Sequence, residues 1–129
     1  MYKILLIEDD KFLQKAIQDK FSIENFELLV AGDGKEGLAK ALETHPDFIL
    51  LDLVMPVMDG EETLIELKKN PETKAIPVSI LTAVSRESST YFNDNTLLDQ
   101  VVGYWEKDQN GIEKIVGKVQ NYLDKKLSQ

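Results

Sequence analysis

The chain has 129 residues, the size of one ordinary globular domain with room for a buried core. Its 15 basic and 23 acidic residues give a net charge of −8, which disfavours nonspecific binding to nucleic acid or anionic membranes. Cysteine is absent, which excludes disulfides, thiolate catalysis and thiolate metal sites. No apolar run is long enough to cross a membrane, and the first expected strand leaves no room for a signal peptide. We therefore expect a single cytoplasmic domain over residues 1–129.

The first expected strand, residues 3–7, runs directly into the acidic residues 8–10. A helix with 3.6-residue spacing is predicted over residues 11–21, and Asp10 is placed to cap it. The residues expected to face the core from this helix are Phe12, Ala16, Ile17 and Phe21.

A second strand is expected over residues 27–31, and a helix over 34–44 begins with capping-box spacing at Asp33. The apolar run at residues 48–51 has turn residues on both sides, which is typical of a strand buried on both faces. Asp52 follows at the point where this strand stops.

The second half of the chain continues the same alternation. Helices are predicted over residues 60–69 and 112–126, with strands at 77–81 and 101–106. Residues 85–99 predict a fourth helix that is short or irregular. Asp59 is placed to cap the third helix. The buried stripe expected on the last helix is Ile115, Val116, Val119 and Leu123.

Five strands that alternate with helices predict an α/β fold of the (βα)5 type. Right-handed crossovers make such a sheet parallel and cover both of its faces with helices, in the doubly wound manner. Ligands of open α/β sheets bind beyond the carboxyl ends of the strands. The residues that follow each strand are therefore the candidates for function.

Polar side chains follow four of the expected strands, and the topology brings them to one edge. They are Glu8 and Asp9, then Asp52, Thr82 and Lys107. Clustered carboxylates repel one another, and Mg²⁺ is the hard cation that relieves this repulsion through oxygen ligands. A carboxylate beside Mg²⁺ can act as a nucleophile toward phosphorus, while a lysine and a hydroxyl hold the phosphoryl oxygens. Each residue alone has a plainer interpretation, as a helix start or a surface charge.

Four segments together resemble the receiver domains of two-component response regulators. They are residues 4–10, 51–60, 81–83 and 104–107, and the resemblance extends over almost the whole chain. It implies a flavodoxin-like sheet with strand order 2-1-3-4-5. It also implies a signalling module, not an enzyme, that accepts a phosphoryl group from a phosphohistidine on a sensor histidine kinase or a phosphotransfer protein.

The resemblance also assigns roles at the acidic edge. Asp52 is the implied phosphoacceptor and, with the backbone carbonyl of Val54, an implied Mg²⁺ ligand. Asp9 is expected to bind Mg²⁺ directly and Glu8 through water.

The same resemblance assigns the phosphoryl oxygens and the switch. The implied phosphoryl-binding groups are Thr82, the backbone amide of Ala83, and Lys107. Thr82 and Tyr104 form the implied switch, through which phosphorylation changes a docking face for a downstream protein. That face is built from the fourth helix, fifth strand and fifth helix.

The sequence departs from the family pattern at three places. Asp108 replaces the usual proline after Lys107, so we expect a trans peptide bond and a rearranged loop. Val54 and Val84 occupy the positions that tune hydrolysis of the acyl phosphate. Because both are apolar and cannot orient water, we expect slow self-dephosphorylation. Residues 85–102 lack the usual small segment, which predicts an atypical fourth helix and its own partner surface.

Two other functions fit parts of the pattern. A pseudo-receiver has the same fold but binds partners without phosphorylation, and the odd Lys107–Asp108 step is compatible with it. A phosphatase with an aspartyl intermediate needs a second aspartate two residues after the nucleophile, where this chain has Val54.

Overall fold

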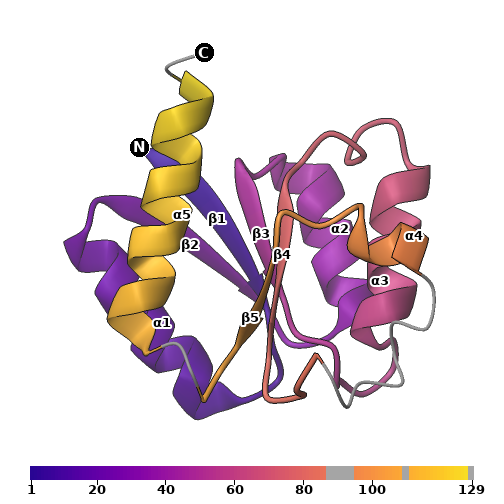
Figure 1. Cartoon of the computed structure of the whole chain (residues 1–129), viewed down its shortest axis with the longest axis horizontal. Coiled ribbons are helices and arrows are strands. Elements are labelled where there is room, and N and C mark those ends of the chain that lie inside the picture. The colour runs from indigo at the N-terminus through magenta and orange to yellow at the C-terminus, as the bar shows by residue number, and fades with distance from the viewer. Residues whose placement is uncertain (87–94, 109–110, 128–129) are drawn as a thin grey trace.

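In the computed structural model the residues described are 1–86, 95–108 and 111–127, and they form five strands and five helices (Figure 1). The strands are β1 (Tyr2–Ile7), β2 (Phe26–Ala31), β3 (Phe48–Leu51), β4 (Val78–Thr82) and β5 (Gly103–Glu106). The helices are α1 (Lys11–Ile23), α2 (Gly34–Thr44), α3 (Gly60–Lys69), α4 (Asn95–Leu98) and α5 (Ile112–Leu127).

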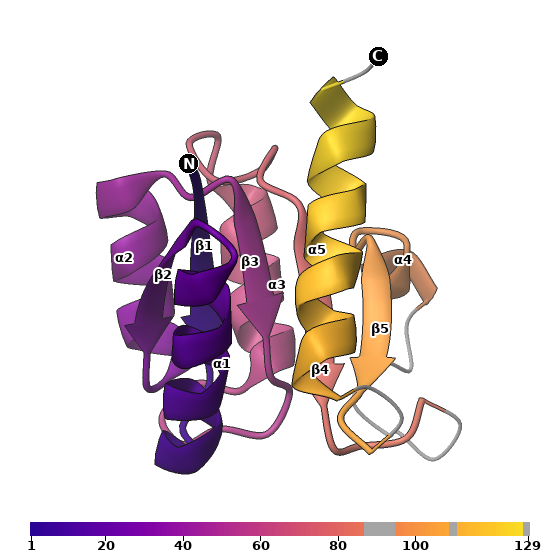
Figure 2. The ribbon, with the colours of Figure 1, turned by 90° about the vertical axis from the view of Figure 1, so that its left-hand side faces the viewer.

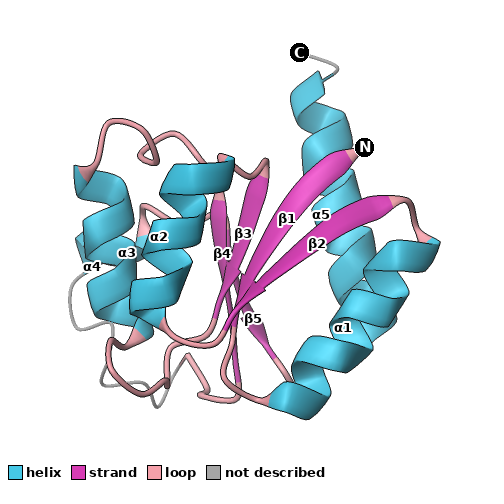
Figure 3. Ribbon diagram, turned by 180° about the vertical axis from the view of Figure 1, so that it is seen from behind, coloured by secondary structure: helices cyan, strands magenta, loops and turns pink. Residues whose placement is uncertain are grey.

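All strand pairs are parallel, and the sheet order is β2-β1-β3-β4-β5, as expected. Helices α1 and α5 cover one face of the sheet, while α2, α3 and α4 cover the other (Figures 1 and 3). This confirms the doubly wound α/β fold. Strand β5 is an edge strand, and its last residues lead into the same end of the sheet as those of β1 and β3.

Each face of the sheet has its own apolar core because strand side chains alternate between faces. From β1, Leu5 and Ile7 enter the core under α2 and α3, whereas Ile4 and Leu6 enter the core under α1 and α5. The apolar run of β3 is fully buried along its length, as its sequence predicts. The stripe predicted on α5 is also buried.

Three aspartates cap helices as the sequence predicts. The Asp10 carboxylate accepts hydrogen bonds from two backbone amides in the first turn of α1. Asp33 and Asp59 do the same for α2 and α3, each accepting from one backbone amide. An N-cap of this kind stabilises a helix by about 1 kcal/mol. The caps fix where three of the helices begin, and two of them stand beside the acidic edge.

The prediction that Phe12 faces the core is wrong, because its side chain is 90% exposed. The buried face of α1 is set by Ile17 and Phe21, with Leu13 packed beside them. In a helix these residues follow one another at four-residue spacing, and Phe12 lies about 100° away from their row. The polar residue Gln14 is buried next to the row instead.

Among the described residues, the expected fourth helix is represented by α4, Asn95–Leu98. Residues 87–94 of the expected irregular segment lie outside the described residues. Strand β5 begins at Gly103, two residues later than predicted. Within the described ranges, no helix combines the length and apolar character needed to span a lipid bilayer.

Candidate functional site

Backbone hydrogen bonds continue the sheet ladders one residue beyond the strands and so bring three polar residues to one edge. The Glu8 amide donates to the Ala31 carbonyl at 2.9 Å, and the Asp52 amide donates to the Ile7 carbonyl at 3.0 Å. The Lys107 amide donates to the last carbonyl of β4 at 2.8 Å. These residues are therefore held by the sheet itself rather than by flexible loops.

The carboxylates of Glu8, Asp9 and Asp52 form one cluster. One oxygen from each lies within 4.8 Å of the others, a spacing at which a single cation could contact all three. Glu8 and Asp52 are buried, whereas Asp9 is exposed. Oxygen-only ligands of this kind suit Mg²⁺, which also keeps several waters. The donor set and its partial exposure therefore fit Mg²⁺.

Lys107 is the positive charge of this edge. Its Nζ lies 2.5 Å from Glu8 Oε1 and 3.5 Å from Asp52 Oδ2, so it bridges the two buried carboxylates. No peptide bond among the described residues is cis, which confirms the trans bond expected between Lys107 and Asp108. The lysine thus reaches the acidic cluster without the proline that usually follows it.

Burial and charge set the protonation of this pair. Burial raises the pKa of Glu8 to about 7, with the Asp52 charge adding to the rise, while the bonds from Lys107 and the Asp10 amide oppose it. Burial lowers the pKa of Lys107, but its hydrogen bond to Glu8 and the nearby carboxylates outweigh burial and raise it overall. Lys107 is therefore firmly cationic, and its positive charge favours the ionised form of Glu8 against the effect of burial.

Two contacts that the sequence reasoning missed hold Glu8 in place. The Gln14 side-chain amide donates to the Glu8 backbone carbonyl at 2.5 Å, and the Asp10 amide donates to Glu8 Oε2 at 3.0 Å. Gln14 is a polar residue on the buried side of α1. A polar side chain at a position expected to be buried could have indicated this contact from the sequence. The direct Glu8–Lys107 pair was also missed, because the resemblance assigned Lys107 to phosphoryl oxygens only.

Comparison with known proteins identifies this arrangement. Residues 4–120 match the response regulator receiver domain family. The chain belongs to this family. It is 39% identical over 103 residues to the transcriptional regulatory protein CpxR of Klebsiella pneumoniae. The aligned region covers 80% of this chain and 38% of CpxR. The receiver domain thus spans less than two fifths of the length of the curated relatives it matches.

Solved structures agree with this assignment. The receiver domain of Francisella response regulator 1452 superposes with a TM-score of 0.81 at 30% identity and covers 98% of this chain and 99% of its own. The Mn²⁺-bound form of response regulator Rcp1 gives 0.76 at 30% identity, covering 95% of this chain and 94% of its own.

The expected switch residues of the receiver domain, Thr82 and Tyr104, lie on β4 and β5. Thr82 is fully buried, and its hydroxyl accepts a 3.4 Å hydrogen bond from the Val84 amide. The Tyr104 hydroxyl donates to the Val84 carbonyl at 2.8 Å. The two switch residues therefore contact the same loop residue. Ala83 is exposed beside them, and Val54 is exposed in the loop after Asp52.

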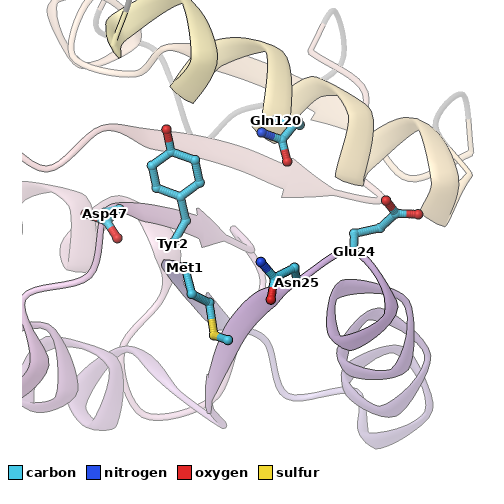
Figure 4. A pocket seen from close by; sticks show the side chains of 6 residues that line it. All are labelled: Met1, Tyr2, Glu24, Asn25, Asp47 and Gln120. Atoms are coloured by element: carbon cyan, nitrogen blue, oxygen red, sulfur yellow. The ribbon is translucent and has the colours of Figure 1, made fainter.

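A cavity of about 550 Å³ lies at the opposite end of the sheet from the acidic cluster, at the start of β1. Its lining residues surround an open space and come from the N-terminal residue, β1, the α1–β2 turn, the segment before β3, and α5 (Figure 4). Because Tyr2 begins β1 and Glu8 follows its end, this cavity is separated from the candidate site by the length of the strand. The chemistry of the receiver domain is therefore expected at the shallow acidic edge and not in this cavity.

Proposed function

We propose that this chain is a phosphorylation-controlled signalling receiver whose phosphoacceptor is Asp52. The observation that carries the proposal is the placement of a buried aspartate beside two further carboxylates and 3.5 Å from the ammonium of Lys107. A nucleophilic carboxylate, a site for a cation and a fixed positive donor are the groups that phosphoryl transfer requires. The chain acts in the cytoplasm through other proteins and not as an enzyme, with a sensor histidine kinase or phosphotransfer protein as its phosphoryl donor.

In the transfer step, a carboxylate oxygen of Asp52 attacks the phosphorus of a phosphohistidine. An O–P bond forms, the P–N bond breaks, and its electron pair returns to the imidazole nitrogen. Lys107 donates to the phosphoryl oxygens, and its ammonium has three N–H donors to share between them and Glu8. Thr82 and the backbone amide of Ala83 are the proposed additional donors at this edge.

Glu8, Asp9 and Asp52 are the residues proposed to hold Mg²⁺, together with the backbone carbonyl of Val54. When bound, Mg²⁺ offsets the negative charge of the carboxylates and of the incoming phosphoryl oxygens. The clustering of the three carboxylates and the Mn²⁺-bound form of the related Rcp1 support this proposal.

The proposed output is a change in the docking face formed by α4, β5 and α5. Phosphorylation draws the Thr82 hydroxyl toward the phosphoryl group and away from the Val84 amide. The hydrogen bond of Tyr104 to Val84 couples the same loop to β5. We infer that the loop after β4 has two arrangements, and that the charge of the phosphoryl group favours one of them. Such a loop acts as a two-state switch.

Val54 and Val84 are proposed to make the acyl phosphate long-lived, because neither side chain can orient an attacking water. The variants Val54→Asn and Val84→Glu should shorten the lifetime of the phosphorylated form by about tenfold. Decay of the phosphorylated chain on phosphate-affinity gels measures it. Unchanged lifetimes in both variants would remove this part of the proposal.

Phosphorylation by a small-molecule donor such as acetyl phosphate tests the function directly. The wild type should incorporate phosphate in Mg²⁺ and lose this ability in EDTA. Asp52→Asn should abolish incorporation, whereas the matched control Asp47→Asn, at the other end of β3, should leave it unchanged. Incorporation that survives Asp52→Asn would place the phosphate elsewhere.

A pseudo-receiver is the alternative that two features favour: Lys107 pairs more closely with Glu8 than with Asp52, and no proline follows it. Beryllofluoride, which mimics the phosphoryl group, separates the two functions. Mg²⁺-dependent binding seen by ¹⁹F NMR supports the phosphorylated receiver. No binding, together with no incorporation from acetyl phosphate, supports the pseudo-receiver.

A further inference from the structure

A groove of about 330 Å³ lies between β5 and α5, which run side by side at one edge of the molecule (Figure 2). It is separate from the acidic cluster and lies on the outer side of the last strand. Its lining residues are Val102, Trp105, Lys118, Asn121, Tyr122 and Lys125.

The floor of the groove is aromatic and is fixed from below. Trp105 stacks on the buried Phe48 with ring centroids 6.1 Å apart and an angle of 13° between the planes. Tyr122 meets the same Phe48 ring edge-on at 5.5 Å. Because one buried ring positions both, the floor is a preformed platform, and a partner side chain loses little energy in ordering it. Val102, 42% exposed, extends the apolar surface.

The rim of the groove is cationic. The Nζ of Lys118 stands 5.3 Å from the centre of the Trp105 ring, and Lys125 lies two turns further along α5. These lysines, with Asn121 and Tyr122, follow i, i+3, i+4 and i+7 spacing and therefore form one stripe of the helix. No carboxylate is among the groove's lining residues in the described part of the chain. Helix α5 carries four lysines and two acids, although the whole chain has a net charge of −8.

We propose that this groove docks an acidic segment of a partner protein, with an aromatic or aliphatic side chain on Trp105 and carboxylates on Lys118 and Lys125. This inference rests on the proposed function, because it names the chemistry of the output partner. Complementary charge selects the partner and speeds its approach, while the aromatic platform supplies the buried anchor. The net charge of −8 disfavours nucleic acid as the occupant. Trp105 lies next to Tyr104 on β5 and two residues before Lys107, which follows the strand at the acidic edge.

The intrinsic fluorescence of Trp105 tests the proposal, since it is the only tryptophan of the chain. The probes are a short peptide in which aspartates surround two phenylalanines, and its counterpart with lysines in place of the aspartates. The acidic peptide should change the emission saturably and bind at least about tenfold more tightly than the basic one. The double variant Lys118→Glu/Lys125→Glu should weaken its binding by about tenfold or more.

Lys114→Glu is the matched control, because Lys114 is exposed on α5 but does not line the groove. It should change the affinity by less than about twofold. Circular dichroism and thermal unfolding show whether each variant is folded. Equal affinity for the two peptides, an equal loss in Lys114→Glu, or tighter binding of an oligothymidylate than of the acidic peptide would overturn the proposal.

Repeating the titration with and without Mg²⁺ and beryllofluoride separates this inference from the proposed function. If the peptide binds equally in both conditions and beryllofluoride itself does not bind, the docking proposal is supported and the proposed control by phosphorylation is contradicted. If beryllofluoride binds by ¹⁹F NMR but the peptide does not, the receiver function stands and the groove proposal fails.

Discussion

At the scale of single residues, Val57 is the most strained residue of the loop that follows Asp52. Its φ is +70°, and the Met58 amide donates across it to the Pro56 carbonyl at 2.7 Å, which defines a γ-turn with a positive central φ. A β-branched residue in this region is a genuine outlier and costs on the order of 1–3 kcal/mol. Since Val57 is 77% exposed, contacts of its side chain offset little of this strain energy.

Val57→Gly should therefore stabilise the protein by about 1 kcal/mol, because glycine adopts positive φ without steric cost. The matched control Val57→Thr keeps the branching at Cβ and should stay within about 0.5 kcal/mol of the wild type. Urea unfolding measures both, through the midpoint at unchanged slope. A glycine variant no more stable than the threonine variant would show that the turn is not strained.

The buried Glu8 makes stability depend on pH in a direction opposite to that of most carboxylates. Its pKa is about 7 in the folded protein against an ordinary value of 4.5, so the folded state holds the proton more tightly than the unfolded chain does. This contribution to stability is complete below about pH 4.5 and is lost as pH rises through about 7. Glu8→Gln should remove this dependence, and Glu27→Gln, at an exposed position, should not. Urea unfolding across this pH range measures it, and an unchanged profile in Glu8→Gln would contradict the assignment.

At the scale of elements, the close approach of α3 to the segment that follows β3 depends on Gly60. A Cβ at this position would stand 2.3 Å from the Asp52 carbonyl oxygen and 2.6 Å from the Leu53 Cα, both backbone atoms. Gly60→Ala should thus destabilise the protein by about 2 kcal/mol or more and displace Asp52. Gly117→Ala on α5 is the control, since its Cβ meets open space and helix propensity should stabilise it by about 0.5–1 kcal/mol. Thermal unfolding compares the two, and equal effects would show that α3 can move away freely.

The elements and their order followed from the sequence because the apolar runs and the caps act locally. Strands such as β3 are buried on both faces, and Asp10, Asp33 and Asp59 cap helices where they stand in the sequence. The rotation of α1 did not follow, because Phe12 and Leu13 are both apolar and only packing against the sheet chooses between them.

Which residues form the candidate site could be predicted in the same way, but which of their side chains bond one another could not. Strand ends predicted that Glu8, Asp52 and Lys107 would share one edge. That Lys107 bonds Glu8 more closely than Asp52, and that Gln14 holds the Glu8 carbonyl, depends on side-chain conformations that no spacing in the sequence encodes.

At the scale of the whole molecule, the acidic edge concentrates charge in a chain that already has a net charge of −8. A cation that binds only the folded state stabilises it by mass action, by about 2.7 kcal/mol at 100 times its Kd. Mg²⁺ should therefore raise the unfolding temperature in a concentration-dependent way relative to EDTA. Asp9→Asn should reduce this rise, while Asp99→Asn, an exposed aspartate after α4, should not. An identical rise in both variants would assign the effect to general screening.

The contact between Lys107 and Glu8 joins residues 99 positions apart in the chain. Of the five strands, β5 is the last to be synthesised, and it adds to the outer edge of a sheet whose acidic residues follow earlier strands. A nascent chain that has emerged only as far as β4 carries its clustered carboxylates without their lysine. The acidic edge around Asp52 is thus complete only when β5 has joined the sheet, after the four other strands have been made.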